Sequence, residues 1–263
     1  MPLSLGVKSR IIPRWASASW VIGFTLLGGS LGYGEPASVA TISPSDLVEY
    51  QSQPPAVKVL IERALALTKR ELAYTYGSNS PSNQGMDCSG SVQFTLKSMA
   101  EGEVPRSSYG MYHWVKESGK LIDTPGVVET TDPVFALLKP GDLLFWIGTQ
   151  TTSGRVPPIS HVMVYLGTLR EDGKGVVFGA SSGRRYRGKK IHGVSVFDWK
   201  VPSESSAAEF VGFGAIPGLV NETKILENET KILENAVVAP PEKKKVLKSV
   251  LEFLFRKPDR AKQ

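Results

Sequence analysis

The stretches Asp142-Leu-Leu-Phe-Trp-Ile147 and His161-Val-Met-Val-Tyr-Leu166 decide the class of fold. Each is a short run of apolar side chains rich in β-branched or aromatic residues, and the first follows the turn residues Lys139-Pro140-Gly141. Such runs are typical of buried strands. Further strands are expected at residues 176–178, 194–199 and 210–216. The second half of the chain therefore predicts a sheet of about five strands.

The residues before this sheet follow a different spacing. Apolar side chains recur at helical intervals from Ala56 to Leu72 and again from Cys88 to Met99, which indicates helices with one buried face. A third short helix is expected after Pro105. Helices followed by strands, rather than alternating with them, favour an α+β domain with N-terminal helices packed on a C-terminal antiparallel sheet. We place this domain at residues 56–216.

The N-terminus has the pattern of an export signal. Lys8, Arg10 and Arg14 precede an uncharged, mostly apolar run from Ala16 to Gly32, and a plausible cleavage site follows at residues 38–40. The run is shorter than the roughly 20 residues that a spanning helix needs, so a cleaved signal is preferred to an uncleaved anchor. Residues 1–40 are thus assigned to the signal peptide and residues 41–55 to a linker. Both alternatives predict export to the periplasm or cell surface of a bacterium.

The C-terminal part, residues 217–263, differs in composition from the domain. The heptad Asn221–Glu227 is repeated without change as residues 228–234. Two heptads are too few to define a coiled coil, so a duplicated polar linker is favoured. The tail at residues 243–257 mixes basic and apolar residues, and it could lie on an anionic membrane or wall polymer, or form an ordinary solvated or packed helix.

Charge excludes one class of partner. The formal net charge is +6, but basic residues are concentrated at the two ends of the chain, and residues 41–241 are close to neutral. No basic stripe runs through the expected domain, so nucleic acid is not predicted as a partner.

Cys88 is the single cysteine of the chain, which excludes an internal disulfide and a cysteine-based zinc site. It is either a small buried hydrophobic residue or a nucleophile. Its position favours the nucleophile, because the sequence Met86-Asp-Cys-Ser-Gly-Ser-Val92 lies where a loop becomes a helix. Free N–H groups and the helix dipole should lower the pKa of the thiol there and hold an oxyanion, while Ser89 and Gly90 leave room for a substrate carbonyl.

A nucleophilic cysteine needs a base, and the chain has three histidines. His161 opens a predicted strand, where a rigid backbone can direct a side chain into a cleft. A cysteine at a helix start and a histidine on a strand form the pair found in papain-like peptidases. His113 lies between Tyr112 and Trp114 and is interpreted as structural. We therefore predict Cys88 and His161 as the catalytic pair.

At this point the sequence resembles the NlpC-type cell-wall peptidases, which have a compact papain-like fold. The resemblance implies Cys88 as nucleophile and His161 as base, with Tyr76 near the oxyanion and substrate. It also places Asp87, Ser89, Arg106, Ser107 and Ser160 at the substrate. Family members cleave peptidoglycan stem peptides, often between D-glutamate and a diamino acid. The matching stretches are Tyr74–Gly77, Asp87–Gly90, Val104–Tyr109, Lys139–Leu143, Ser160–Val162 and Val164–Gly167.

One position departs from the family pattern. The family has a polar residue, usually histidine, on the next strand to orient the catalytic imidazole, and the alignment puts Gly179 there. His192 could take this role from the neighbouring strand if residues 181–190 form a long hairpin loop. A backbone carbonyl or a water is an equal alternative, and a weakened or inactive enzyme is the third.

These residues support more than one function. The preferred one is a cysteine hydrolase that cleaves peptidoglycan stem peptides or muropeptides through a thioester, with no metal or organic cofactor. The alternatives are a non-catalytic wall-binding module with a degenerate site, and an acyltransferase that uses the same thioester.

Overall fold

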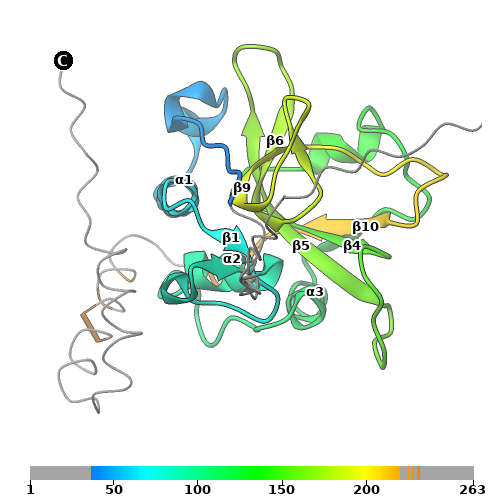
Figure 1. Ribbon diagram of the computed structural model, residues 1–263, viewed down its shortest axis with the longest axis horizontal. Coiled ribbons are helices and arrows are strands. Elements are labelled where there is room, and N and C mark those ends of the chain that lie inside the picture. Colours follow the sequence, from blue (N-terminus) through cyan, green and yellow to red (C-terminus); the bar gives the residue numbers. More distant parts are fainter. Residues whose placement is uncertain (1–36, 220–223, 225–226, 228–229, 232–263) are drawn as a thin grey trace, which may run out of the picture. The chain divides into compact units, whose positions relative to one another are not determined.

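The computed structural model describes residues 37–219, 224, 227 and 230–231. Along this part of the chain, helices come first and most strands follow (Figure 1). The α-helices are α1 (Pro55–Thr68), α2 (Cys88–Leu96) and α3 (Ser108–Glu117). Short 3-10 helices lie at η1 (Pro44–Asp46), η2 (Tyr50–Ser52), η3 (Pro81–Asn83) and η4 (Pro133–Leu137).

The main sheet has six strands and is antiparallel throughout. Its spatial order is β3-β10-β4-β5-β6-β9. Two small ribbons accompany it, one of β1 (Ala73–Tyr74) with β2 (Gly85–Met86) and one of β7 (Arg185–Tyr186) with β8 (Lys189–Lys190). The main strands are β3 (Leu121–Asp123), β4 (Leu143–Ile147), β5 (Ile159–Thr168), β6 (Gly175–Ser181), β9 (Gly193–Asp198) and β10 (Glu209–Gly214).

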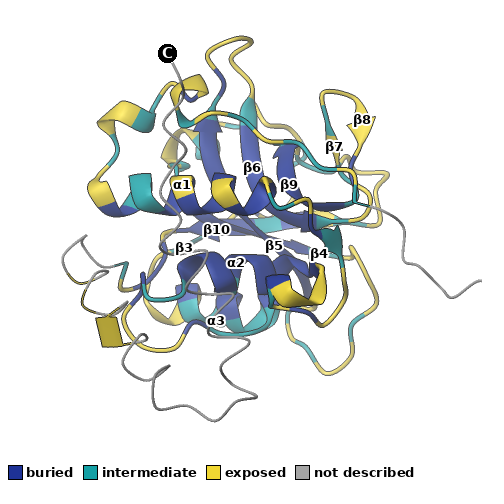
Figure 2. Ribbon diagram, turned by 60° about the vertical axis from the view of Figure 1, so that its left-hand side comes forward, coloured by how far each residue is buried: buried dark blue, intermediate teal, exposed yellow. Residues whose placement is uncertain are grey.

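The two faces of the sheet are covered differently. One face carries Val162, Val164 and Phe178, and it packs against buried residues of all three helices. The other face carries Trp146 and Met163 and is covered by η4 and by loops. In Figure 2 the buried residues follow the strands and the sides of α1, α2 and α3 that face the sheet. Because side chains alternate along a strand, neighbouring residues of β5 serve the two faces in turn.

These observations confirm the predicted α+β class, with N-terminal helices packed on an antiparallel sheet. The predicted helices begin close to their observed starts, and the five predicted strands correspond to β4, β5, β6, β9 and β10. The sheet has one strand more than expected, because Leu121–Asp123 pairs with the distant β10 and is too short to give a periodic signal. Residues 181–190 do form a hairpin, which contains β7 and β8.

The segment assigned to a linker, residues 41–55, packs onto the domain. Leu47 is completely buried and pairs with Leu169, while the carboxylate of Glu49 accepts a hydrogen bond from the N–H of Thr168. Leu47 is an apolar residue inside a polar stretch, and this signal was not used in assigning the stretch to a linker. The folded unit therefore extends further towards the N-terminus than residue 56.

Most of residues 1–40 and 217–263 lie outside the described residues, and so do the signal pattern and the basic tail. Within the described part, no helix has both the length and the apolar character to cross a membrane.

Candidate active site

Cys88 is the first residue of α2 and lies buried at the bottom of a cavity of about 300 Å³. Helix α2 starts here because the side chain of Asp87 caps it, accepting a hydrogen bond from the N–H of Gly90 at 2.6 Å. The backbone N–H groups of Ser89 and Val162 both donate to the sulfur of Cys88. Val162 belongs to β5, so the thiol is fixed between a helix start and the strand that carries His161.

Asp87 holds this arrangement together. Its carboxylate also accepts hydrogen bonds from the N–H of Gly77 at 2.9 Å, from the hydroxyl of Ser89 at 3.2 Å and from both terminal nitrogens of Arg106 at 3.0 and 2.7 Å. A carboxylate offers about four lone-pair positions. The chain's own donors therefore occupy the carboxylate of Asp87, which fits a positioning residue better than the substrate contact predicted from sequence.

The resting charge of Cys88 differs from the sequence expectation. Burial, and to a lesser extent the nearby carboxylate of Asp87, raise the pKa of the thiol to about 11. The N–H groups of Val162 and Ser89 and the cation of Arg106 act in the opposite direction, as a helix start should, but they do not outweigh burial. The thiol is thus neutral at neutral pH and needs a base to become a nucleophile.

His161 lies on β5 directly opposite Trp146 on β4, and the two rings are 5.6 Å apart between centroids. It lines a second cavity of about 810 Å³. Burial lowers the pKa of its imidazole well below the usual value, and the cation of Arg184 lowers it further. The imidazole is therefore neutral at neutral pH and is in the correct state to act as a base.

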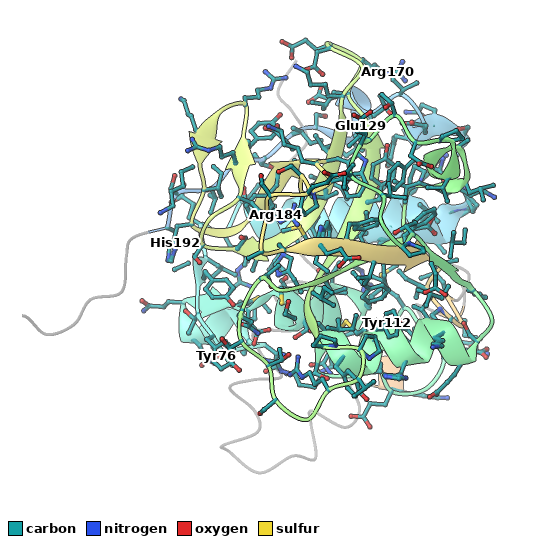
Figure 3. All side chains as sticks on the ribbon, turned by 90° about the vertical axis from the view of Figure 1, so that its right-hand side faces the viewer. Tyr76, Tyr112, Glu129, Arg170, Arg184 and His192 are labelled. Atoms are coloured by element: carbon teal, nitrogen blue, oxygen red, sulfur yellow. The ribbon has the colours of Figure 1, made fainter. Side chains whose placement is uncertain are left out.

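The two cavities adjoin and share part of their walls, including Tyr76 and Ser160. Arg184 interacts electrostatically with both residues of the pair. Its cation lowers the pKa of His161, and the ionised form of Cys88 raises the pKa of Arg184. In Figure 3 Arg184 is labelled above Tyr76, on the left-hand side of the view where His192 also lies. Among the described residues, the side chains of Cys88 and His161 form no hydrogen bond with each other, which is common before substrate binds.

The orienting position predicted at Gly179 is filled by another side chain. A Cβ atom added to Gly179 would lie 3.0 Å from Cγ of Met163, which is two residues from His161 and on the same side of β5. Nε2 of His161 is buried and has no hydrogen-bond partner in the part of the chain that the structure describes. The place from which an orienting group would reach the imidazole is thus occupied by a thioether chain.

His192 contacts Ser38 and Tyr74 beside β9. His192 precedes β9, pairs with Ser38 through backbone hydrogen bonds and has its ring 6.5 Å from that of Tyr74. The ring pair that involves His161 among the described residues is with Trp146. This arrangement gives no support to an orienting role for His192. The same applies to His113 as a base, since its ring packs against Tyr109 and Tyr112.

The remaining predicted substrate residues surround the two cavities. Tyr76 is 74% exposed and is free to contact a substrate. Ser107 caps α3 by accepting from the N–H of Gly110, and the hydroxyl of Ser160 bonds to the backbone N–H of Thr149. The hydroxyl of Ser89 accepts from Arg106. Most of these side chains therefore shape the site, and Tyr76 has the most freedom to bind.

Sequence reasoning missed Arg184, Trp146 and Arg155. Arg155 donates to the backbone oxygen of Ile159 and lines the cavity of Cys88. The adjacent pair Arg184-Arg185, in the hairpin after the strand that carries Gly179, was a signal that could have been used. No group of three or more His, Cys, Asp or Glu side chains able to hold a metal ion occurs among the described residues.

Comparison with known proteins gives one family. The model of the NlpC/P60 family matches residues 71–193. No curated protein matches this chain. A solved structure of a novel NlpC/P60 endopeptidase from Photobacterium damselae subsp. piscicida is similar at a TM-score of 0.34 and 15% sequence identity. The similarity covers 56% of this chain and 37% of that chain, so the match spans little more than a third of that endopeptidase.

Proposed function

The model of the NlpC/P60 family matches residues 71–193, and from this premise we propose that the protein is a cysteine hydrolase that cleaves amide bonds in peptidoglycan stem peptides. Cys88 is the proposed nucleophile and His161 the proposed base. The finer proposal is an endopeptidase that cuts between D-glutamate and a diamino acid.

One observation carries the proposal. The thiol of Cys88 lies at the start of α2, receives N–H groups from Ser89 and Val162, and opens into a cavity that adjoins the one lined by His161. A cysteine with a purely structural role needs no backbone N–H donors at its sulfur. It also needs no neutral imidazole on His161, which precedes the donor Val162 on β5. These features are those of a nucleophile that is activated during the reaction.

The proposed reaction follows from the resting charges. Because the thiol and the imidazole are both neutral, His161 takes the proton of Cys88 as the sulfur attacks the amide carbon. The backbone N–H of Cys88, at the start of α2, stabilises the oxyanion. His161 then gives the proton to the leaving amine, which breaks the C–N bond and leaves a thioester. Water, deprotonated by His161, attacks the thioester and releases the carboxylic acid and the thiol.

A second function is favoured by a specific observation. Nε2 of His161 has no partner, and Met163 fills the space beside Gly179. Loss of the orienting group weakens control of the imidazole tautomer. A module that binds wall peptides without turnover, or an acyltransferase whose thioester is resolved by an amine, would use the same cavity.

The test is incubation of the purified protein with muropeptides, with and without an added amine acceptor, followed by mass spectrometry. Hydrolysis gives two fragments whose masses sum to that of the substrate plus one water. Transfer gives a fragment that carries the acceptor. Binding without either product supports the non-catalytic module and rejects the enzyme.

We further propose that the protein is exported and that its tail contacts an anionic surface. The pattern at residues 1–40 supports export, and the basic and apolar residues at 243–257 support the contact. Fractionation of a bacterium that expresses the full chain tests the first proposal. Sedimentation with anionic vesicles, with and without residues 242–263 and at two salt concentrations, tests the second.

A further inference from the structure

Arg184 is a cation built into the cavity of His161. The loop that carries it is fixed by backbone groups, since the oxygen of Arg184 accepts from the N–H of Ile191 at 2.9 Å and its N–H donates to the hydroxyl of Ser181. Its guanidinium lies 4.2 Å from the ring centre of Trp146, the residue paired with His161. The residue is half-buried, its backbone is held by these hydrogen bonds, and its side chain contacts the ring of Trp146.

This guanidinium has no anionic partner among the described residues. The ion pairs among the described residues are made by other cations than Arg184. Asp198 lines the same cavity, but its carboxylate accepts a hydrogen bond from the backbone N–H of Arg187. Burial lowers the pKa of Arg184 to about 10, which still leaves it charged at neutral pH. A half-buried cation without a carboxylate is costly unless a ligand supplies the charge.

The packing leaves the binding edge of the guanidinium available. Trp146 covers one face of the planar group through a cation–π contact. The N–H groups lie in the plane, so stacking does not consume them, and they match the two oxygens of a carboxylate. Lys200 and Arg185 line the same cavity and add to its positive charge.

The position of the cavity indicates which part of the substrate carries the anion. The thioester forms on Cys88, so the acyl part of the substrate occupies the smaller cavity. His161 gives its proton to the leaving amine, so the amine part lies in the larger cavity with Arg184. We propose that Arg184 binds a carboxylate on the leaving-amine side of the scissile bond and so selects substrates whose diamino acid has a free terminal carboxylate. This inference rests on the proposed function.

A bound carboxylate also changes the base. Arg184 opposes formation of the imidazolium of His161, because both are cations. A carboxylate on Arg184 neutralises that field, so His161 accepts the proton of Cys88 more readily when the selected substrate is present. Recognition and activation are then two results of one contact, and the selected substrate gains in kcat as well as in binding.

The experiment uses the full chain and two stem peptides that differ in one group, a carboxylate or a carboxamide at the end of the diamino acid side chain. We expect the wild-type kcat/KM to favour the carboxylate by tenfold or more. Arg184→Met should bring this ratio close to one, and Arg184→Lys should keep part of it because the charge remains. Lys190→Met is the matched control, since it removes an exposed cation of the same hairpin that does not line the cavity. An Arg184→Met ratio equal to that of the wild type overturns the proposal.

A binding measurement separates this proposal from the proposed function. In the Cys88→Ala background, calorimetry with the free diamino acid should show tighter binding of the carboxylate form than of the carboxamide form, and Arg184→Met should remove the difference. Discriminating binding without hydrolysis by the wild type rejects the enzyme and keeps the subsite. Hydrolysis without discrimination keeps the enzyme and rejects the subsite.

Discussion

The Cys88 side and the His161 side of the candidate site are built in different ways. Around Cys88 the polar groups satisfy one another: Asp87 accepts from Gly77, Ser89, Gly90 and Arg106, and the sulfur receives two N–H groups. Around His161 they do not, since within the described part of the chain Nε2 of the imidazole has no hydrogen-bond partner and Arg184 has no anionic partner. The first side is complete in the free protein, whereas the second has positions that a ligand would fill.

This difference indicates a division of labour. A fully satisfied network resists movement, which suits the group that must meet a carbonyl in one geometry. An incomplete polar environment favours ligands that complete it. Substrate choice should therefore depend more on the His161 side, and the chemical step on both.

The largest expected effect is at Cys88. Cys88→Ala should reduce hydrolysis by roughly 10⁴-fold or more, because no other side chain can form the thioester. Alanine is close in size and keeps the start of α2, so the circular dichroism spectrum should not change. Turnover that survives in this variant would remove Cys88 from the mechanism.

His161→Ala should reduce kcat by about 10³-fold, because the neutral thiol of Cys88 loses its base. Alkylation of Cys88 by iodoacetamide at mildly acidic pH should slow as well. His113→Ala is the control, as its ring packs within α3 and should leave alkylation unchanged. If both variants alkylate at the wild-type rate, Cys88 and His161 are not paired.

On the Cys88 side, Asp87→Asn should lower the free energy of unfolding by about 1–3 kcal/mol, since Arg106 would lose its ion pair. Arg106 is partly exposed, so solvent screening places the effect towards the lower end. Asp172→Asn is the control, because its pair with Lys174 lies on an exposed turn and should leave the free energy of unfolding close to that of the wild type. Urea unfolding of the three proteins gives the comparison, and equal losses would mean that the network adds nothing.

On the His161 side, Arg184→Met should move a pH profile. Arg184 lowers the pKa of His161, so its removal raises that pKa. A base must be unprotonated, and the raised pKa means that the imidazole becomes protonated at a higher pH as acid is added. The acid limb of kcat/KM, measured on the carboxamide substrate, should therefore shift to higher pH. A shift to lower pH, or no shift, would show that Arg184 does not act on the imidazole.

The smallest expected effect is at His192. Because its ring lies beside Tyr74 rather than Trp146, His192→Ala should leave kcat within about twofold of the wild type. A tenfold loss of kcat at unchanged KM would instead restore the orienting role suggested by the sequence. It would also show that the two sides of the site are more alike than the structure indicates.

The sequence predicted one side of the site better than the other, for a physical reason. The surroundings of Cys88 come mainly from neighbours along the chain, such as Asp87, Ser89 and the helix start, so a local motif describes them. The surroundings of His161 come from strand pairing and a hairpin, which bring together Trp146, Met163 and Arg184. Burial also reversed the expected shift in the pKa of Cys88, because a motif gives the helix start but not the depth of the thiol.

The fold followed the same rule. The long apolar strands were predicted because each carries its own periodic signal, whereas β3 and the packing of Leu47 depend on partners far along the chain. The missed elements are those that a tertiary partner stabilises.

The residues that run beside β9 cover one edge of the main sheet. An uncovered edge strand can pair with the edge of another molecule and start aggregation. Here the oxygens of Ser38, Leu72 and Ala40 accept from the N–H groups of His192, Val194 and Val196 along the outer side of β9. The opposite edge is β3, which is three residues long. A sheet with one edge covered and the other this short offers little template for pairing with the strand of a second copy.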